Sequence, residues 1–309
     1  MGWLSFIQDP NTQWVLGGTT LLGICSGVIG CFAYLRRQSL MGDALAHAAL
    51  PGICIAFMIT GTKSIFSFFM GALIAGIIAT FAIGYITRET RIKQDAALGI
   101  ILTVFFGIGI VLLTQIQHSS YGNQSGLDKF LFGQAAAMVS KDVAIMAIIC
   151  ASLIVAVTLF FKEFKLVSFD PGFAKGIGLP IRFLGQFIMF LIVVAVVVGI
   201  QAVGVVLMAA MLITPAVSAR YWTDRLSIMI ALSGVFGGIS GVGGTLISTM
   251  GANLPTGPLI VLSATAVFMV SVLFAPEKGV IAKARVRRYM KKKTARTNLS
   301  INELEGGKS

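Results

Sequence analysis

Two ionisable side chains lie four residues apart in an otherwise apolar stretch, LMGDALAHAALPG at residues 40–52. They are Asp43 and His47, and Pro51 follows four residues later. On an α-helix, residues i and i+4 project from the same face. A proline at 51 also removes the N–H that would bond the His47 carbonyl, so we predict a helix break there. Oxygen ligands with some nitrogen suit Mn²⁺ and related divalent ions, whereas Cu⁺ would need thiolates or thioethers.

The elements that must position this pair are membrane spans. Of the 309 residues, 56% are hydrophobic and 12% are charged, about half the charged fraction of a soluble domain. A span needs ~20 apolar residues, and the candidates are 14–35, 39–60, 64–87, 95–116, 141–161, 182–200, 202–219, 226–248 and 256–275. We therefore predict an all-α polytopic membrane protein with nine transmembrane helices. Eight is the alternative, because 182–219 is one apolar stretch that we divide at residues 201–204.

Asp43 and His47 are the only carboxylate and the only imidazole that these spans place well inside the membrane. The other acidic residues fall in loops, tails or span edges, and His118 lies in a polar loop. An ionised Asp at the membrane centre costs roughly 2.5–3.5 kcal/mol on insertion scales, so the pair should face protein or a water-filled path. The alternatives to a metal path are a hydrogen bond between the two that holds helices together, and a proton relay without metal. Cys54 is left out of the site because Pro51 disturbs the helical register.

The distribution of Lys and Arg predicts the orientation. With the N-terminus outside, 21 of the 24 basic residues lie in cytoplasmic loops or in the C-terminal tail, and three remain outside: Lys63, Lys129 and Lys141. This places the C-terminus in the cytoplasm and requires an odd number of spans. The net charge of +12 then reflects membrane topology, and we expect no nucleic-acid partner. Residues 1–278 form the transmembrane domain in this interpretation, and 279–309 form a basic, partly disordered tail near anionic head groups.

A second segment, FKLVSFDPGFAKGIGLP at 164–180, falls in a cytoplasmic loop under this topology. Asp170 can cap a helix, and Pro171 suits the first helical position. Gly176 and Gly178 would end the helix after about two turns. We predict a short docking helix near 170–178, with Ala174 on the surface that meets another protein; an ordinary surface turn is the alternative.

These motifs resemble the permease subunits of ABC importers for manganese, zinc and iron, the ABC-3 family. The resemblance includes LMGDALAHAALPG and SFDPGFAKGIGL, together with QDAALGI (94–100), VGVVLMAAMLITPAVSA (203–219) and NLPTGPLIVL (253–262). It implies a type II ABC importer-like permease in the cell membrane. By position, Asp43 and His47 would be metal-path residues, and Asp170 through Gly178 the helix that couples to the ATPase.

The resemblance also implies partners: a second copy of the chain, a cytoplasmic ABC ATPase subunit and an extracytoplasmic metal-binding protein. The chain has no nucleotide-binding motif of its own, so we expect a transport subunit and not an enzyme. No permanently bound cofactor is expected, and the cargo is a divalent metal, with manganese first and zinc or ferrous iron open. A proton-coupled secondary transporter is the rival function. An intramembrane metalloenzyme is disfavoured because HExxH is absent and one intramembrane His is too few.

Overall fold

The computed structural model describes residues 10–36, 38, 40–61, 65–118, 133, 138–251, 254–276 and 278–284. Within these ranges the regular elements are all helices, which confirms the predicted fold class. They are α2 (Pro10–Leu35), α3 (Met41–Thr60), α4 (Ile65–Glu89), α5 (Gln94–His118), α7 (Ser140–Leu159), α8 (Phe161–Phe169), α9 (Pro171–Gly176), α10 (Ile181–Val203), α11 (Val205–Trp222), α12 (Leu226–Thr249) and α13 (Thr256–Phe274). Most of the tail predicted at 279–309 lies outside the described residues.

Eight of the described helices are long and apolar enough to cross a membrane: α2, α3, α4, α5, α7, α10, α12 and α13. The remaining predicted span corresponds to α11, a helix of 18 residues. The division expected at residues 201–204 is present, because α10 ends at Val203 and Gly204 adopts a φ of 95°. Such a φ suits glycine and ends the first helix. The chain is therefore a multi-pass membrane protein in which eight described helices have the length and composition of membrane spans, and α11 is a ninth, shorter helix in the bundle. Because α11 lies between α10 and α12 in the chain, the predicted orientation, which requires an odd number of crossings, counts α11 as a crossing as well.

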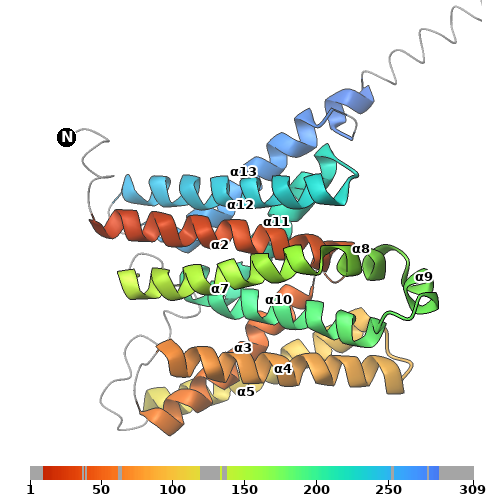
Figure 1. The fold of residues 1–309 in the computed structure, drawn as a ribbon. Helices are drawn as coiled ribbons and strands as arrows, with labels where there is room; N and C mark the ends of the chain where they lie inside the picture. Colours follow the sequence, from red (N-terminus) through yellow and green to blue (C-terminus); the bar gives the residue numbers. More distant parts are fainter. Residues whose placement is uncertain are drawn as a thin grey trace, which may run out of the picture.

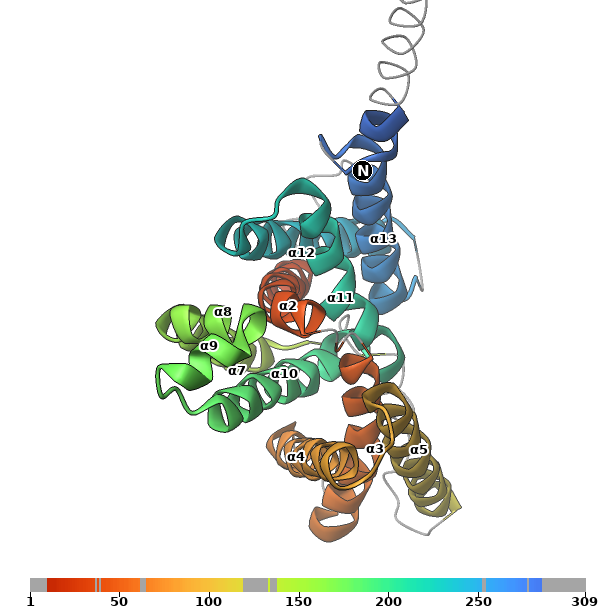
Figure 2. The same ribbon diagram turned by 90° about the vertical axis from the view of Figure 1, so that its right-hand side faces the viewer.

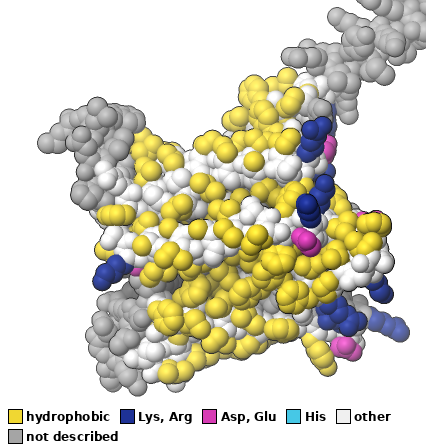
Figure 3. Space-filling view, in the orientation of Figure 1, with side chains coloured by type: hydrophobic (Ala, Val, Ile, Leu, Met, Phe, Trp, Pro, Cys, Tyr) yellow, Lys and Arg dark blue, Asp and Glu magenta, His cyan; other side chains and the backbone are white. Residues whose placement is uncertain are grey.

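The helices form layers around α2 (Figures 1 and 2). α12 and α13 lie on one side of α2, α7 and α10 lie on the other, and α3, α4 and α5 form a group beyond them. α2 begins at one end of the bundle and α13 stops at the other. Lys and Arg side chains gather at the end where α8 and α9 lie (Figure 3). This gathering is what the predicted orientation requires, with the α8–α9 end in the cytoplasm.

Small residues let α2 and α12 pack backbone to backbone. A Cβ on Gly23 would lie 2.1 Å from the carbonyl oxygen of Gly237. The Ser233 hydroxyl donates a hydrogen bond of 2.7 Å to the carbonyl of Gly27. The glycine-rich stretch at 234–244 therefore packs against α2 of the same chain, in the way that small residues bring membrane helices together.

The helix that carries Asp43 and His47 is held by its own neighbours, α4 and α5. A Cβ on Gly52 would lie 2.2 Å from the carbonyl oxygen of Gly71 on α4. The Cys54 thiol lies 3.8 Å from the carbonyl of Gly109 on α5 and donates to it. These close contacts hold the half of α3 that follows Pro51 against α4 and α5.

Candidate functional site

Asp43 and His47 lie side by side near the start of α3. The Nε2 atom of His47 is 3.4 Å from the Oδ1 atom of Asp43. A strong N–H···O hydrogen bond is shorter, at about 2.7–3.2 Å. Both residues also belong to one helix, so a bond between them would not join two helices. The predicted shared face is confirmed, and the purely structural interpretation of the pair loses its main support.

The pair remains partly accessible, and the imidazole is held in place. The side chain of Asp43 is 37% exposed and that of His47 is 15% exposed. The ring of Phe106, on α5, meets the His47 ring edge-on with centroids 4.7 Å apart. The Nδ1 atom of His47 is buried and has no hydrogen-bond partner among the residues that the structure describes. The ring atom that faces Asp43 is Nε2, so Nε2 is the nitrogen that could share a ligand with the Asp43 carboxylate.

Pro51 does not break the helix, and the predicted break is wrong in that respect. α3 runs without interruption from Met41 to Thr60, with Pro51 inside it. A proline is tolerated in a membrane helix when neighbouring helices hold the backbone, and the Gly52–Gly71 contact does so here. The chemical consequence of the proline remains, because it has no N–H to offer the His47 carbonyl. That carbonyl adds an oxygen to the same helical turn.

The described part of one chain does not hold a complete set of metal ligands. Among the described residues, no three His, Cys, Asp or Glu side chains come together as ligands. Octahedral oxygen-rich coordination, the kind that suits Mn²⁺, needs about six ligands. Cys54 is not one of them, because its thiol is bonded to Gly109. A metal bound at Asp43 and His47 would therefore need ligands in addition to these two described side chains.

The second predicted segment forms a short helix, α9, at the right-hand end of the bundle, next to α8 and α10 (Figure 1). Asp170 caps it as predicted: its Oδ1 accepts a hydrogen bond of 2.9 Å from the N–H of Phe173. Pro171 is the first helical residue. The helix ends at Gly176, earlier than the predicted 178, and Gly178 follows with a φ of 83°. The N–H of Leu179 then bonds the Ala174 carbonyl at 3.0 Å, which closes the end of the helix.

Ala174 does not lie on the docking surface, and this prediction is wrong. Its side chain is fully buried in the hydrophobic core, because α9 packs against α8 and α10 on that side. Three of the exposed residues of the segment are instead large and apolar: Phe169 at 54%, Phe173 at 57% and Ile177 at 55% exposure. Their spacing of four residues was visible in the sequence and could have identified them. We name these three residues the α9 surface.

A family model described as the ABC 3 transport family matches residues 8–275. The chain belongs to the ABC 3 transport family. This match covers the predicted permease domain almost entirely. It includes α3 with the Asp43–His47 pair and α9 with its cap.

Similar proteins are named as membrane proteins of manganese and zinc transport systems. The chain is 55% identical over 299 residues to the manganese transport system membrane protein MntC of Bacillus subtilis, covering 97% of this chain and 68% of that protein. It is 45% identical over 285 residues to the zinc transport system membrane protein TroC of Treponema pallidum, covering 92% and 96%. A solved structure, PsaBC from Streptococcus pneumoniae in complex with Fab, matches with a TM-score of 0.79 at 35% identity, covering 94% of this chain and 98% of that chain.

Proposed function

We propose that this ABC 3 family chain is the membrane permease subunit of an ATP-driven importer of a divalent transition metal, with manganese as the first candidate. The observation that carries the proposal is the Asp43–His47 pair on a membrane-spanning helix, in which Nε2 of His47 lies 3.4 Å from Oδ1 of Asp43 and both side chains remain partly accessible. The 55% identity to a protein named as a manganese transport subunit supports the choice of cargo.

In this proposal Asp43 and His47 are ligands along the metal path. A carboxylate, an imidazole and the carbonyl freed by Pro51 form an oxygen-rich set without thiolate, which suits Mn²⁺ better than a soft ion. Zinc accepts the same nitrogen and oxygen ligands, and the relative named as a zinc transport protein keeps zinc as the alternative. Ferrous iron is the third candidate for the same ligand chemistry.

The incomplete ligand set supports a path formed between two copies of the chain. One copy provides two ligand side chains at the pair, and a second copy would bring another Asp43 and His47. Metal would be delivered from outside by an extracytoplasmic binding protein, with the N-terminus of the permease on that side. The gathering of basic side chains at the α8–α9 end supports this orientation.

Coupling to ATP hydrolysis is assigned to α9 and the residues around it. A separate cytoplasmic ABC ATPase would bind the α9 surface, because Phe169, Phe173 and Ile177 expose apolar area at the end that is proposed to face the cytoplasm. Apolar side chains exposed together outside the membrane mark interaction sites. ATP binding and hydrolysis in the partner would move α9 and alternately open the path to the two sides of the membrane.

The test is transport by the purified chain, reconstituted in liposomes with its ATPase and binding protein. We expect uptake of radioactive manganese that requires ATP and stops when the ATPase carries an inactivating substitution. Uptake driven by a pH gradient in the absence of ATP would instead establish the proton-coupled alternative, with Asp43 and His47 as the relay. ATP-dependent uptake of zinc but not manganese would support the proposed class of transporter and show that zinc, not manganese, is the transported metal.

A further inference from the structure

The His47 ring packs against α5, the helix beside α3 (Figure 2). Among the described residues its aromatic neighbour is Phe106, whose ring plane stands at 78° to the imidazole with centroids 4.7 Å apart. Edge-to-face contact of this kind is a preferred arrangement of two rings. Phe106 is itself partly exposed, so the contact lies at the side of the bundle and not deep in its core. Phe106 therefore contacts one of the two proposed ligands from a different helix.

The imidazole of His47 lacks the hydrogen bond that commonly orients a metal ligand. A metal-binding imidazole usually donates its second ring N–H to a carboxylate, a carbonyl or water, and this bond fixes the direction of the ring. In His47 the nitrogen that faces Asp43 is Nε2, so the second nitrogen is Nδ1. Nδ1 is buried and has no hydrogen-bond partner among the described residues. Within the described part of the chain, packing is therefore what orients the ring.

A close approach of the two helices brings Phe106 to His47. Three residues beyond each of them, Leu50 on α3 meets Gly109 on α5, where an added Cβ would lie 2.8 Å from Cδ2 and 2.9 Å from Cγ of Leu50. One turn further along α3, the Cys54 thiol donates to the Gly109 carbonyl at 3.8 Å. A side chain at position 109 would push α5 away from α3, and the aromatic ring one turn earlier on α5 would move with it.

We propose that Phe106 is a positioning residue for metal transport. Its ring holds the His47 imidazole in the orientation that turns Nε2 toward Asp43, in place of a hydrogen bond on Nδ1. This inference rests on the proposed function, because it takes His47 as a metal ligand. Exchange of the ring for an aliphatic side chain leaves the ligand present but free to turn. Loss of a group that orients a ligand lowers metal affinity about 10–100-fold.

The test measures Mn²⁺ binding to the chain and its ATPase subunit together in nanodiscs. Free Mn²⁺ gives a sharp electron paramagnetic resonance signal, and the loss of this signal on titration gives the affinity. Electron spin echo envelope modulation detects an imidazole nitrogen bound to Mn²⁺. We expect a nitrogen signal in the wild-type chain that disappears in His47→Ala. Phe106→Leu should bind Mn²⁺ about tenfold more weakly, with a weaker nitrogen signal at equal occupancy, and Phe106→Tyr, which keeps the ring, should recover most of both.

Two further variants separate positioning from general packing. Phe105→Leu is the matched control, because it makes the same substitution at a partly buried residue of the same helical turn, whose side chain projects about 100° away from that of Phe106. It should leave the affinity and the nitrogen signal unchanged. Gly109→Ala keeps Phe106 but displaces α5 from Leu50, so it should weaken Mn²⁺ binding in the same direction as Phe106→Leu. It also tests the proposal if Phe106→Leu fails to fold.

The results distinguish a failure of the inference from a failure of the proposed function. If His47→Ala removes the nitrogen signal but Phe106→Leu and Gly109→Ala keep it at full strength and with wild-type affinity, the positioning role is overturned and the proposed function stands. Equal losses in Phe106→Leu and Phe105→Leu would also overturn it, since general packing would then explain both. A wild-type chain without a His47-dependent nitrogen signal would overturn the ligand role of His47, and the positioning role of Phe106 with it.

Discussion

The ring of Phe164 lies edge-on against the ring of Phe32, with centroids 5.6 Å apart and planes at 73°. Phe164 is fully buried on α8, the helix that leads into α9, and it also meets Phe160 and Phe187. Phe32 lies near the end of α2, which leads into α3 and Asp43. The contact therefore joins the segment proposed to bind the ATPase to the helix that precedes the metal pair.

Replacing Phe164 with alanine should weaken the packing of α8 against α2. Phe→Ala in a packed core costs roughly 3–5 kcal/mol, so we expect a lower unfolding temperature in detergent and slower metal uptake. Leu159→Ala, at an exposed site at the end of α7, serves as the control and should change stability by about 0.5 kcal/mol or less. If the Phe164→Ala chain unfolds at the wild-type temperature and transports at the wild-type rate, the aromatic contact neither stabilises the fold nor supports transport.

The Asp43–His47 pair gives a second prediction. Asp43→Asn and His47→Ala should each abolish metal uptake while the protein remains in the membrane, because each removes one of very few ligands. Asp43→Asn does so with little change in shape, whereas His47→Ala also removes the ring that packs against Phe106. Uptake of radioactive manganese in cells without other importers measures the effect, and membrane immunoblots measure the amount of protein. Cys54→Ala is the control and should transport normally. Cys54 lies on the same helix, but its thiol donates a hydrogen bond to the carbonyl of Gly109. Near-normal uptake by both pair variants would contradict the metal-path assignment.

The sequence predicted those features that depend on local chemistry. Long apolar runs defined the helices, Gly204 allowed the break between α10 and α11, and the Asp170–Pro171 pair specified the start of α9. Asp43 and His47 shared a face because helical spacing alone requires it.

Features that depend on tertiary contacts could not be predicted in the same way. The buried side of α9 is decided by its packing against α8 and α10, which is why Ala174 was assigned to the wrong face. The continuity of α3 through Pro51 depends on contact between Gly52 and Gly71. The pairing of Asp224 with Lys278 joins residues far apart in the chain.

The α9 surface gives the third prediction. Phe173→Ala removes an exposed apolar side chain and should weaken ATPase association about tenfold or more, in line with the 1–2 kcal/mol or more lost at a central interface residue. Its effect on the unfolding temperature should be small. Pull-down of the ATPase by the variant, beside the wild-type chain, measures the association.

A neighbouring variant separates docking from folding. Ala174→Trp should also lower ATPase association, but by displacing α9 from the core, since overpacking costs about 1–3 kcal/mol or more. It should therefore lower the unfolding temperature, whereas Phe173→Ala should not. If Phe173→Ala retains the ATPase at wild-type strength and transports normally, the segment is only a surface turn.

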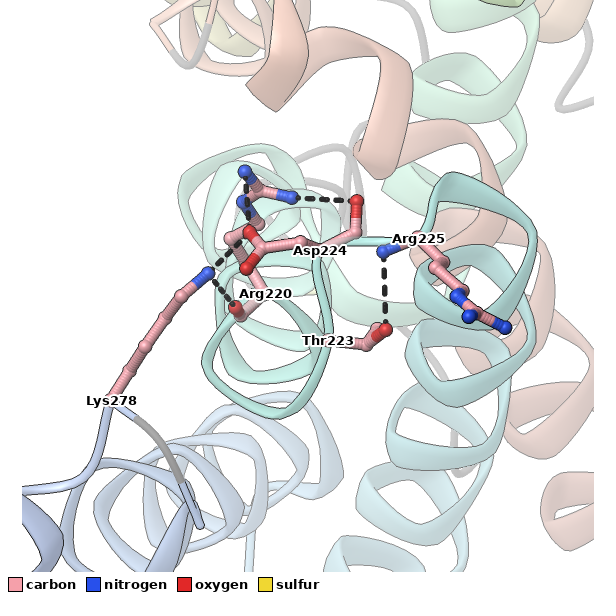
Figure 4. A network of polar contacts seen from close by, with 5 residues as sticks. All are labelled: Arg220, Thr223, Asp224, Arg225 and Lys278. Carbon is pink, nitrogen blue, oxygen red and sulfur yellow. Dashed lines mark hydrogen bonds and ion pairs between the residues drawn. The ribbon is translucent and has the colours of Figure 1, made fainter.

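The ion pairs of Asp224 with Arg220 and Lys278 (Figure 4) predict that the stability of the fold depends on pH. A hydrogen bond from Lys278, together with the positive charges of Arg220 and Lys278, lowers the pKa of Asp224. A carboxyl whose pKa is lower in the folded state stabilises that state above its unfolded pKa, about 3.9, and loses this effect as the pH falls through the folded pKa. Asp224→Asn should therefore lower the unfolding temperature slightly at pH 7 and have no effect at strongly acidic pH. High salt should shrink the difference at pH 7, because the group is exposed. If the difference in unfolding temperature between Asp224→Asn and the wild type persists at acidic pH, the substitution acts through packing and not through charge.

The orientation of the chain gives the last prediction, and the assignment of α9 to the ATPase depends on it. With the native cysteines removed, Ser125→Cys lies between α5 and α7 in the sequence, and Thr294→Cys lies in the basic segment after α13. The positive-inside rule places the first outside and the second in the cytoplasm. An impermeant thiol reagent applied to intact cells should label Ser125→Cys alone, and both positions should be labelled after the membrane is opened. Labelling of Thr294→Cys alone in intact cells would show that the chain has the opposite orientation in the membrane. The α9 surface would then face away from any cytoplasmic ATPase, and the exposed Phe169, Phe173 and Ile177 would need a partner on the outside.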